Sequence, residues 1–192
     1  MSEIISATAR ERLMKNGQFL VTNVDHETLG QLTKWIIDGR PAKKEFTIVI
    51  CSSGGSPTMV VNFASFAGTL GKEVKLTGVA FGECGSAALA LLQCCHERIA
   101  VKHCGFFIHH VHSNFNTSPH KVSLQRLKEE IADVLRLEQE IVQMQCKRAG
   151  MSIAVWNRLA ERGEMVEGRA MYPVDAHKLG LIDRIVDHYE IF

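Results

Sequence analysis

Short apolar, β-branched segments alternate with amphipathic segments along most of this chain, and glycine-rich turns separate them. Residues 45–51 (Glu-Phe-Thr-Ile-Val-Ile-Cys) are typical of a buried strand, and the turn after them leads into a helix that begins at Pro57. The order recurs with a strand at residues 74–80 and a nearly uncharged helix at residues 86–95. This alternation predicts an α/β fold with a mainly parallel sheet. No repeat, low-complexity stretch or linker interrupts the sequence, so we expect one domain over residues 1–192.

The other helices and strands are predicted from the spacing of apolar and β-branched residues. Apolar residues three and four positions apart indicate helices, and short β-branched runs indicate strands. By these criteria we expect helices at residues 2–16, 26–38, 152–162 and 173–179, and strands at residues 18–22, 98–102, 106–111, 169–172 and 181–186.

A long helix is expected at residues 122–149. Its apolar residues recur at three- and four-residue steps, with a break at Glu138. At 1.5 Å per residue such a helix is about 40 Å long, more than a domain of this size can bury along its whole length. Because an exposed apolar stripe is unfavourable for a monomer, we expect part of the helix to project and to contact a partner surface.

The net charge and the search for targeting signals limit which binding partners and which cellular compartment we expect. The 22 Lys and Arg residues nearly balance the 21 Asp and Glu residues, and a net charge of +1 gives no general attraction to nucleic acid or to an anionic membrane. No run is long enough to span a bilayer, and the residues after Met1 do not resemble a signal peptide. We therefore expect a cytoplasmic protein, without nucleic-acid or membrane partners, whose six cysteines are free thiols.

Three segments carry groups suited to catalysis. Small residues around Ser86, in the run 82–88, allow a sharp strand-to-helix turn that exposes a hydroxyl group. The glycines within residues 52–56 let backbone N–H groups turn toward an anion. His109, at the end of an expected strand, can act as a base if it reaches the serine. Taken singly, each segment also has an ordinary interpretation: a helix cap, a tight turn and a core histidine.

In their order and spacing, these segments resemble the proteolytic subunit of the Clp protease, the ClpP family of the ClpP/crotonase superfamily. The family pattern is strand–SPGGS–helix, strand–GQAASMG–helix, strand–MIHQP, a long helix and an A-x-x-x-G-L-V-D segment. Here it reads CSSGGSP, GECGSAA, FIHHV, the helix from Val122, and AHKLGLID at residues 176–183. The resemblance covers about residues 10–187. It implies a ClpP/crotonase-type fold of repeated β-β-α units with a projecting handle helix.

The resemblance also implies a reaction and its residues. It implies a serine endopeptidase that cleaves peptides or unfolded proteins through an acyl-enzyme. Ser86 matches the family nucleophile, and His109 matches its general base. The backbone N–H groups of Gly55 and Ala87 match the donors of the oxyanion hole. No cofactor or metal is implied.

The third catalytic residue of the family has no direct match. Gly168 occupies the position of the family aspartate. Glu167 is the nearest carboxylate and is the candidate third member, with Asp175 as the alternative. Asp175 is also interpretable as a first-turn acid of a helix that begins at Pro173. A serine–histidine dyad is the remaining possibility, since a triad is defined by geometry and not by position.

The resemblance implies a homo-oligomer of stacked rings that encloses a chamber, a tetradecamer as the first expectation. The N-terminal hairpin through which family members engage an ATP-driven unfoldase has no match here, so the resemblance does not carry a Clp-type ATPase partner with it. Two other functions stay open. Gly168 favours a catalytically weak or inactive ring subunit. A crotonase-like enzyme would use the same oxyanion hole on acyl-CoA thioesters, although Ser86 has no role in most crotonases.

Six of the nine histidines lie between His96 and His120. The neighbouring Cys94 and Cys95 lack the paired spacing that is typical of zinc sites, so we expect no metal site. Residues 110–121 are expected to form a loop near the ring contact. Cys84, two residues before the candidate nucleophile, is either a buried small residue or a modifiable thiol.

Overall fold

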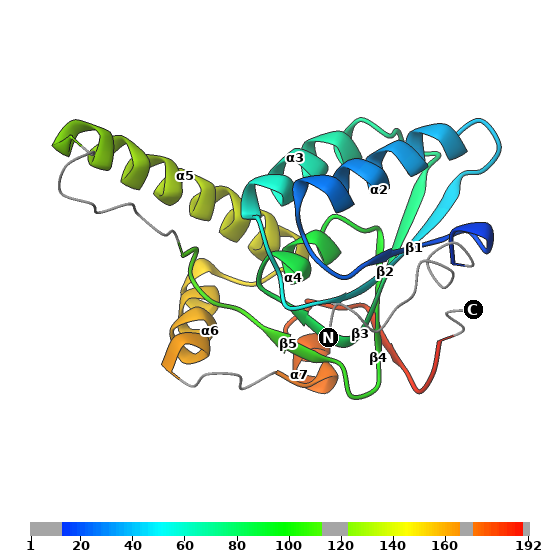
Figure 1. Ribbon diagram of the computed structural model, residues 1–192. Coiled ribbons are helices and arrows are strands. Elements are labelled where there is room, and N and C mark those ends of the chain that lie inside the picture. The colour runs from blue at the N-terminus through cyan, green and yellow to red at the C-terminus, as the bar shows by residue number, and fades with distance from the viewer. Residues whose placement is uncertain (1–12, 113–122, 166–170, 190–192) are drawn as a thin grey trace.

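The computed structural model describes residues 13–112, 123–165 and 171–189 (Figure 1). Strands and helices alternate in its first half, and helices dominate its second half, as predicted. In chain order the elements are β1 (Gln18–Val21), α2 (His26–Gly39), β2 (Glu45–Ser52), α3 (Pro57–Gly68), β3 (Lys75–Gly85), α4 (Ser86–Leu92), β4 (Glu97–Val101), β5 (Gly105–Phe107), α5 (Leu124–Ala149), α6 (Ile153–Met165), α7 (Pro173–Lys178) and β6 (Arg184–Val186).

The sheet is parallel, which confirms the expected α/β class. Its strand order is β1-β2-β3-β4-β6, and β5 also pairs with β3. β3 is long enough for two partners on one edge: residues 77–80 pair with β4, and residues 83–85 pair with β5. The core residues of β2, from Ile48 to Ile50, are fully buried, as expected for a strand covered on both faces.

Helix α4 lies at the centre of the core. It contacts β2, β3, α3 and α5, and Ala87 to Leu92 are all buried. Because the helix has neighbours on every side, charged residues would be unfavourable in it, which explains its uncharged sequence.

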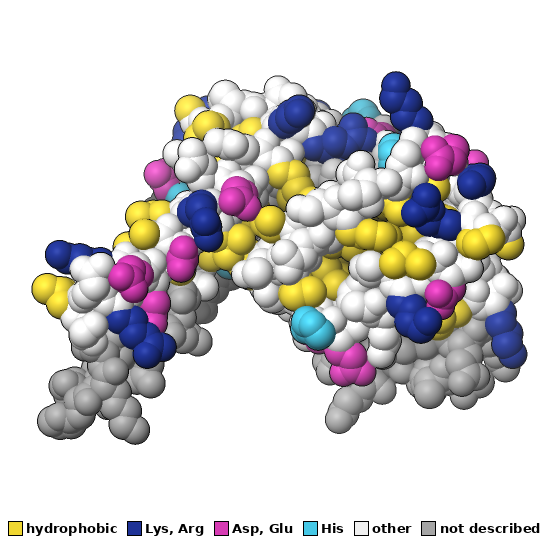
Figure 2. Space-filling view, turned by 90° about the horizontal axis from the view of Figure 1, so that it is seen from above, with side chains coloured by type: hydrophobic (Ala, Val, Ile, Leu, Met, Phe, Trp, Pro, Cys, Tyr) yellow, Lys and Arg dark blue, Asp and Glu magenta, His cyan; other side chains and the backbone are white. Residues whose placement is uncertain are grey.

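Helix α5 projects from the body over its N-terminal half (Figure 1). Ser123 caps it by accepting a hydrogen bond from the Arg126 amide, and Gly150 ends it in the left-handed conformation. Its buried residues all lie in the C-terminal half, from Ile141 to Cys146. Leu124 and Leu135 in the projecting half are 71% and 63% exposed, and Figure 2 shows hydrophobic side chains among charged ones along this arm. The expected handle helix is thus confirmed. Within the described residues, no helix has the length and apolar character needed to cross a membrane.

Several elements differ in extent from the prediction. The strand expected at residues 106–111 ends at Phe107, because its partner β3 ends at Gly85, directly opposite. Conversely, β3 runs five residues past the expected end, around a bulge that pairs Ser52 with Cys84. The helix expected at residues 86–95 ends at Leu92. Most of the helix expected at residues 2–16, residues 169–170 of an expected strand, and residues 113–121 of the expected loop lie outside the described residues.

An ion pair between buried Arg98 and partly exposed Asp183 lies at the end of the segment 176–183, which resembles the family pattern. The Arg98 guanidinium donates to both carboxylate oxygens of Asp183, to the Gln93 side chain and to the Gly180 carbonyl. Arg98 is buried, and its backbone amide also donates to Asp183. The contact ties β4 to the segment between α7 and β6, so this aspartate has a structural role.

Because of the Arg98–Asp183 ion pair, we expect the free energy of unfolding to depend on pH. Partial burial alone would raise the pKa of Asp183, but the hydrogen bonds and charge of Arg98 outweigh it and lower the pKa. The folded-state pKa is therefore below the unfolded value. The stabilisation is complete above about pH 4 and is lost as the pH falls below that value. We expect Asp183→Asn to lower the free energy of unfolding by about 1–3 kcal/mol at pH 6, since the carboxylate is partly exposed, and by less at pH 3.

Urea denaturation of both proteins at the two pH values measures this effect. Asp133→Asn, which alters an exposed carboxylate paired with Arg136 on α5, serves as the control. Parallel pH profiles for the wild type and Asp183→Asn would contradict the assignment.

Candidate active site

Ser86 lies on a strained turn between β3 and α4. It is the first residue of the helix and has φ of +50°, in the left-handed region that side chains other than glycine rarely adopt. The preceding Gly85 packs so closely on Phe107 that an added Cβ would lie 1.9 Å from a ring carbon. The buried strand and helix on either side hold the serine in this conformation. A strained strand-to-helix turn that presents a serine is the arrangement known as a nucleophile elbow.

The second segment, Gly54-Gly55, lies against this turn. Both glycines have φ values that favour glycine, +135° and +143°. A Cβ on Gly54 would lie 2.8 Å from the Ser86 Cβ, and one on Gly55 would lie 2.3 Å from the Val24 carbonyl oxygen. The buried Ser52 hydroxyl fixes the turn by accepting a hydrogen bond from the Gly54 amide. A side chain at Gly54 would therefore push the loop away from the serine, and one at Gly55 would force the loop away from Val24.

The backbone N–H groups of Gly55 and Ala87 are the candidate donors to an oxyanion beside Ser86. The Gly54 carbonyl accepts a hydrogen bond from the Val24 amide, and the Ser56 amide donates to the Val24 carbonyl. The Gly55 amide, which lies between these two groups, therefore points to the side opposite Val24. Ala87 is the second residue of α4, and its amide has no acceptor within the helix. Both residues line one cleft of about 380 Å³ together with Ser86. The arrangement suits the binding of an oxyanion.

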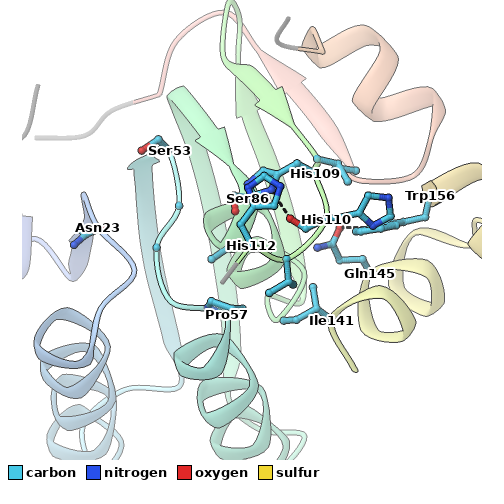
Figure 3. Close-up of a pocket in the computed structure, with 15 residues that line it drawn as sticks. Asn23, Ser53, Pro57, Ser86, His109, His110, His112, Ile141, Gln145 and Trp156 are labelled. Atoms are coloured by element: carbon cyan, nitrogen blue, oxygen red, sulfur yellow. Dashed lines mark hydrogen bonds between the residues drawn. The ribbon is translucent and has the colours of Figure 1, made fainter. Parts of the chain in front are cut away.

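His109 lines the same cleft, just beyond the end of β5 (Figure 3). Its Nδ1 lies 2.5 Å from the carbonyl oxygen of His110. Since a carbonyl can only accept, Nδ1 carries the proton, and Nε2 is left as the basic nitrogen. The ring has two aromatic neighbours, Phe107 and His112, with centroids 6.0 and 4.8 Å away. Ser86 and His109, both described residues, are not hydrogen-bonded to each other, and such bonds are often long before substrate binds.

The family model for Clp protease matches residues 1–189, and so spans all three segments of this site. The chain belongs to the Clp protease family. No curated protein matches the sequence. Clp proteases are serine peptidases that generally assemble into rings, and the family match agrees with the parallel sheet and the long helix α5.

Of the two carboxylates proposed from the Clp protease resemblance, Asp175 is among the described residues, and it does not line the cleft with His109. Glu167 and Gly168 lie outside the described residues. Asp175 lies in the first turn of α7, 3.9 Å from Lys178, and lines a different cavity with Tyr172. Within the described part of the chain, the acceptor for His109 Nδ1 is a backbone carbonyl. No sequence signal marks such a group, because every residue carries one.

Helix α5 holds the segment that follows His109. His110 Nδ1 lies 2.6 Å from one carboxylate oxygen of Glu138, and the Val111 amide donates to the other. The His110 ring also packs edge-on against Trp156, with centroids 5.5 Å apart. Glu138 is the residue that interrupts the apolar stripe of α5, so the break in the sequence pattern marks a contact with the site.

The floor of the cleft comes from two helices of the second half. Ile141 and Gln145 of α5 and Trp156 of α6 line it opposite Ser86 (Figure 3). The Trp156 indole N–H donates to the Gln145 Oε1 at 3.1 Å. The sequence analysis did not select these residues, because no local pattern shows that they meet.

Two buried cysteines near the site, Cys84 and Cys104, have raised pKa values. Burial raises the pKa of Cys84 well above its usual value, and raises the pKa of Cys104 to about 12. Cys84 is fully buried, which favours its interpretation as a small core residue and makes it a poor nucleophile. Within the described residues, no three His, Cys, Asp or Glu side chains are grouped as ligands for a metal ion.

Proposed function

We propose that this Clp protease family member is a serine endopeptidase that cleaves peptides or unfolded proteins, with Ser86 as nucleophile and His109 as general base. One observation carries the proposal. Ser86, in its strained turn, shares a single cleft with His109 and with the N–H groups of Gly55 and Ala87. This combination of nucleophile, base and anion donors is the minimum that acyl transfer requires.

The proposed reaction proceeds through an acyl-enzyme. Nε2 of His109 takes the proton of the Ser86 hydroxyl as the oxygen attacks the peptide carbonyl. The amides of Gly55 and Ala87 donate to the negative charge that develops on the carbonyl oxygen. His109 then gives its proton to the leaving amine, and a water molecule activated by the same base releases the acyl group.

We infer that the carbonyl of His110 orients the base. It holds His109 in the tautomer that leaves Nε2 unprotonated, which is one task of the acid in a triad. A neutral carbonyl stabilises the imidazolium less than a carboxylate does, so a dyad of this kind is expected to be slower than a full triad. Glu167 remains the candidate carboxylate from the sequence.

The second part of the proposal is that the chain forms one domain over residues 1–192 and assembles into rings. The projecting half of α5 exposes Leu124, Ile131 and Leu135 to solvent in a single chain. Contact with α5 of another copy would remove these side chains from water. Two stacked rings of seven, enclosing a chamber, remain the first expectation for the stoichiometry.

A fluorophosphonate tests the proposed nucleophile. The reagent is expected to form one covalent adduct on Ser86, located by peptide mass spectrometry, because only an activated serine attacks it. Labelling is expected to be lost in His109→Ala and kept in the control His103→Asn, which alters an exposed histidine that does not line the cleft. A folded protein that shows no adduct, or an adduct on another serine, would refute the proposal.

A further inference from the structure

The side-chain amide of Gln145 has a fixed orientation in the cleft floor. Gln145 is only 3% exposed, and its Oε1 accepts the hydrogen bond from the Trp156 indole. Because an indole N–H can only donate, the oxygen of the amide must face Trp156, and the NH₂ group must face the other way. In Figure 3 this nitrogen points away from Trp156 toward the middle of the cleft. Among the described residues, none accepts a hydrogen bond from it.

The partner that orients this amide is itself held in place. Trp156 is 1% exposed, and the ring of His110 packs edge-on against it. His110 is bound in turn to Glu138, two helical turns before Gln145 on α5. The indole therefore cannot turn away to release the amide. The result is a rigid donor on a nearly buried side chain, with no acceptor among the described residues.

We propose that Gln145 determines specificity, by selecting substrates with a carboxamide side chain, glutamine or asparagine, at the residue whose carbonyl is attacked. The inference rests on the proposed role of Ser86, since that residue's carbonyl would lie between the serine and the amides of Gly55 and Ala87. Its side chain then fills the adjoining part of the cleft, where Ile141, Gln145 and Trp156 form the floor. The carbonyl oxygen of a carboxamide accepts the free N–H of Gln145.

Other side chains are disfavoured for separate reasons. An aliphatic side chain would cover the Gln145 N–H without accepting its hydrogen bond, and a site built around a buried donor rejects such an analogue. An ammonium group offers no acceptor. A carboxylate can accept, but removing its charge from water beside the buried Ile141 and Trp156 costs more free energy than burying a neutral amide. A neutral acceptor satisfies the donor without adding a charge.

Peptide binding to Ser86→Ala tests this inference without requiring catalysis. Two peptides that differ only in glutamine or methionine at the selected position have side chains of similar length and shape. Isothermal titration calorimetry is expected to give a dissociation constant about 10-fold lower for the glutamine peptide. In Ser86→Ala/Gln145→Met the preference is expected to disappear or reverse. Gln143→Met, an exposed glutamine of α5, is the matched control and is expected to keep it.

A second variant covers the case in which Gln145→Met is poorly folded. Trp156→Phe keeps the aromatic ring but removes the N–H that orients the amide, so the preference is expected to fall without reversing. Equal binding of the two peptides, an unchanged preference in Gln145→Met, or no binding of either at millimolar concentration would each overturn the inference.

These outcomes separate the inference from the proposed peptidase. If Ser86 reacts with the fluorophosphonate and the wild type hydrolyses both peptides with equal kcat/KM, the inference alone fails. If the glutamine peptide binds preferentially and Ser86 does not react, the specificity pocket stands and the peptidase proposal fails.

Discussion

Replacing Ser86 by alanine is expected to lower kcat/KM for a fluorogenic peptide by about 10⁴-fold or more. The hydroxyl forms the bond to the substrate in the proposed reaction, and no other described hydroxyl occupies the strained turn between β3 and α4. Losses of this size follow the removal of a nucleophile or its base from enzymes of this chemistry. Hydrolysis measured over a range of enzyme concentrations quantifies the loss.

The control for this variant is Ser65→Ala, a serine on the exposed side of α3 that bonds only to its own helix. It is expected to keep activity within about twofold. Ser86→Gly adds a stability readout, since glycine adopts φ of +50° without strain and alanine does not. We expect Ser86→Gly to be more stable than Ser86→Ala, and both to be inactive. Substantial hydrolysis by either variant would mean that another group attacks the peptide.

Introducing a side chain at Gly55 is expected to reduce kcat by about 10²–10³-fold, as the loss of one oxyanion donor typically does. The added Cβ would lie 2.3 Å from the Val24 carbonyl oxygen, and φ of +143° is unfavourable for alanine. Because the obstacle is backbone and not a flexible side chain, the loop itself must move. That movement displaces the Gly55 amide from the position in which it would donate to the oxyanion.

Gly68→Ala is the matched control for Gly55→Ala. Gly68 lies in α3, and a Cβ added there meets no atom within 4 Å. It is expected to leave activity unchanged. Thermal unfolding of both variants, followed by circular dichroism, separates lost activity from lost structure. A folded Gly55→Ala with near wild-type kcat would remove Gly55 from the oxyanion hole.

Local sequence patterns predicted the parts of this protein that depend on local physics. The β-branched run of β2 indicated a buried strand, and its core residues are buried. The glycines at 54 and 55 indicated an unusual backbone, and both have positive φ. The extent of α5 followed from its apolar spacing, and the structure ends the helix at Gly150 in the left-handed conformation.

The sequence did not predict what depends on contacts between distant residues. The end of β5 is set by its partner strand, so the expected strand was too long. The Arg98–Asp183 and Trp156–Gln145 contacts join residues on different elements, and neither partner is conspicuous alone. Asp175 had two interpretations in the sequence, and its contact with Lys178 within α7 favours the helix acid.

The division of β3 between two partners has a consequence for motion at the site. Its first part has β2 on one edge and β4 on the other, while the part before Ser86 pairs with the three-residue β5 and, beyond a bulge, with Ser52. Fewer pairings protect the amides there, so local opening requires less free energy at this end of the strand than in the middle of the sheet. The end of β3 before Ser86 can therefore open locally while the centre of the sheet stays protected from hydrogen exchange.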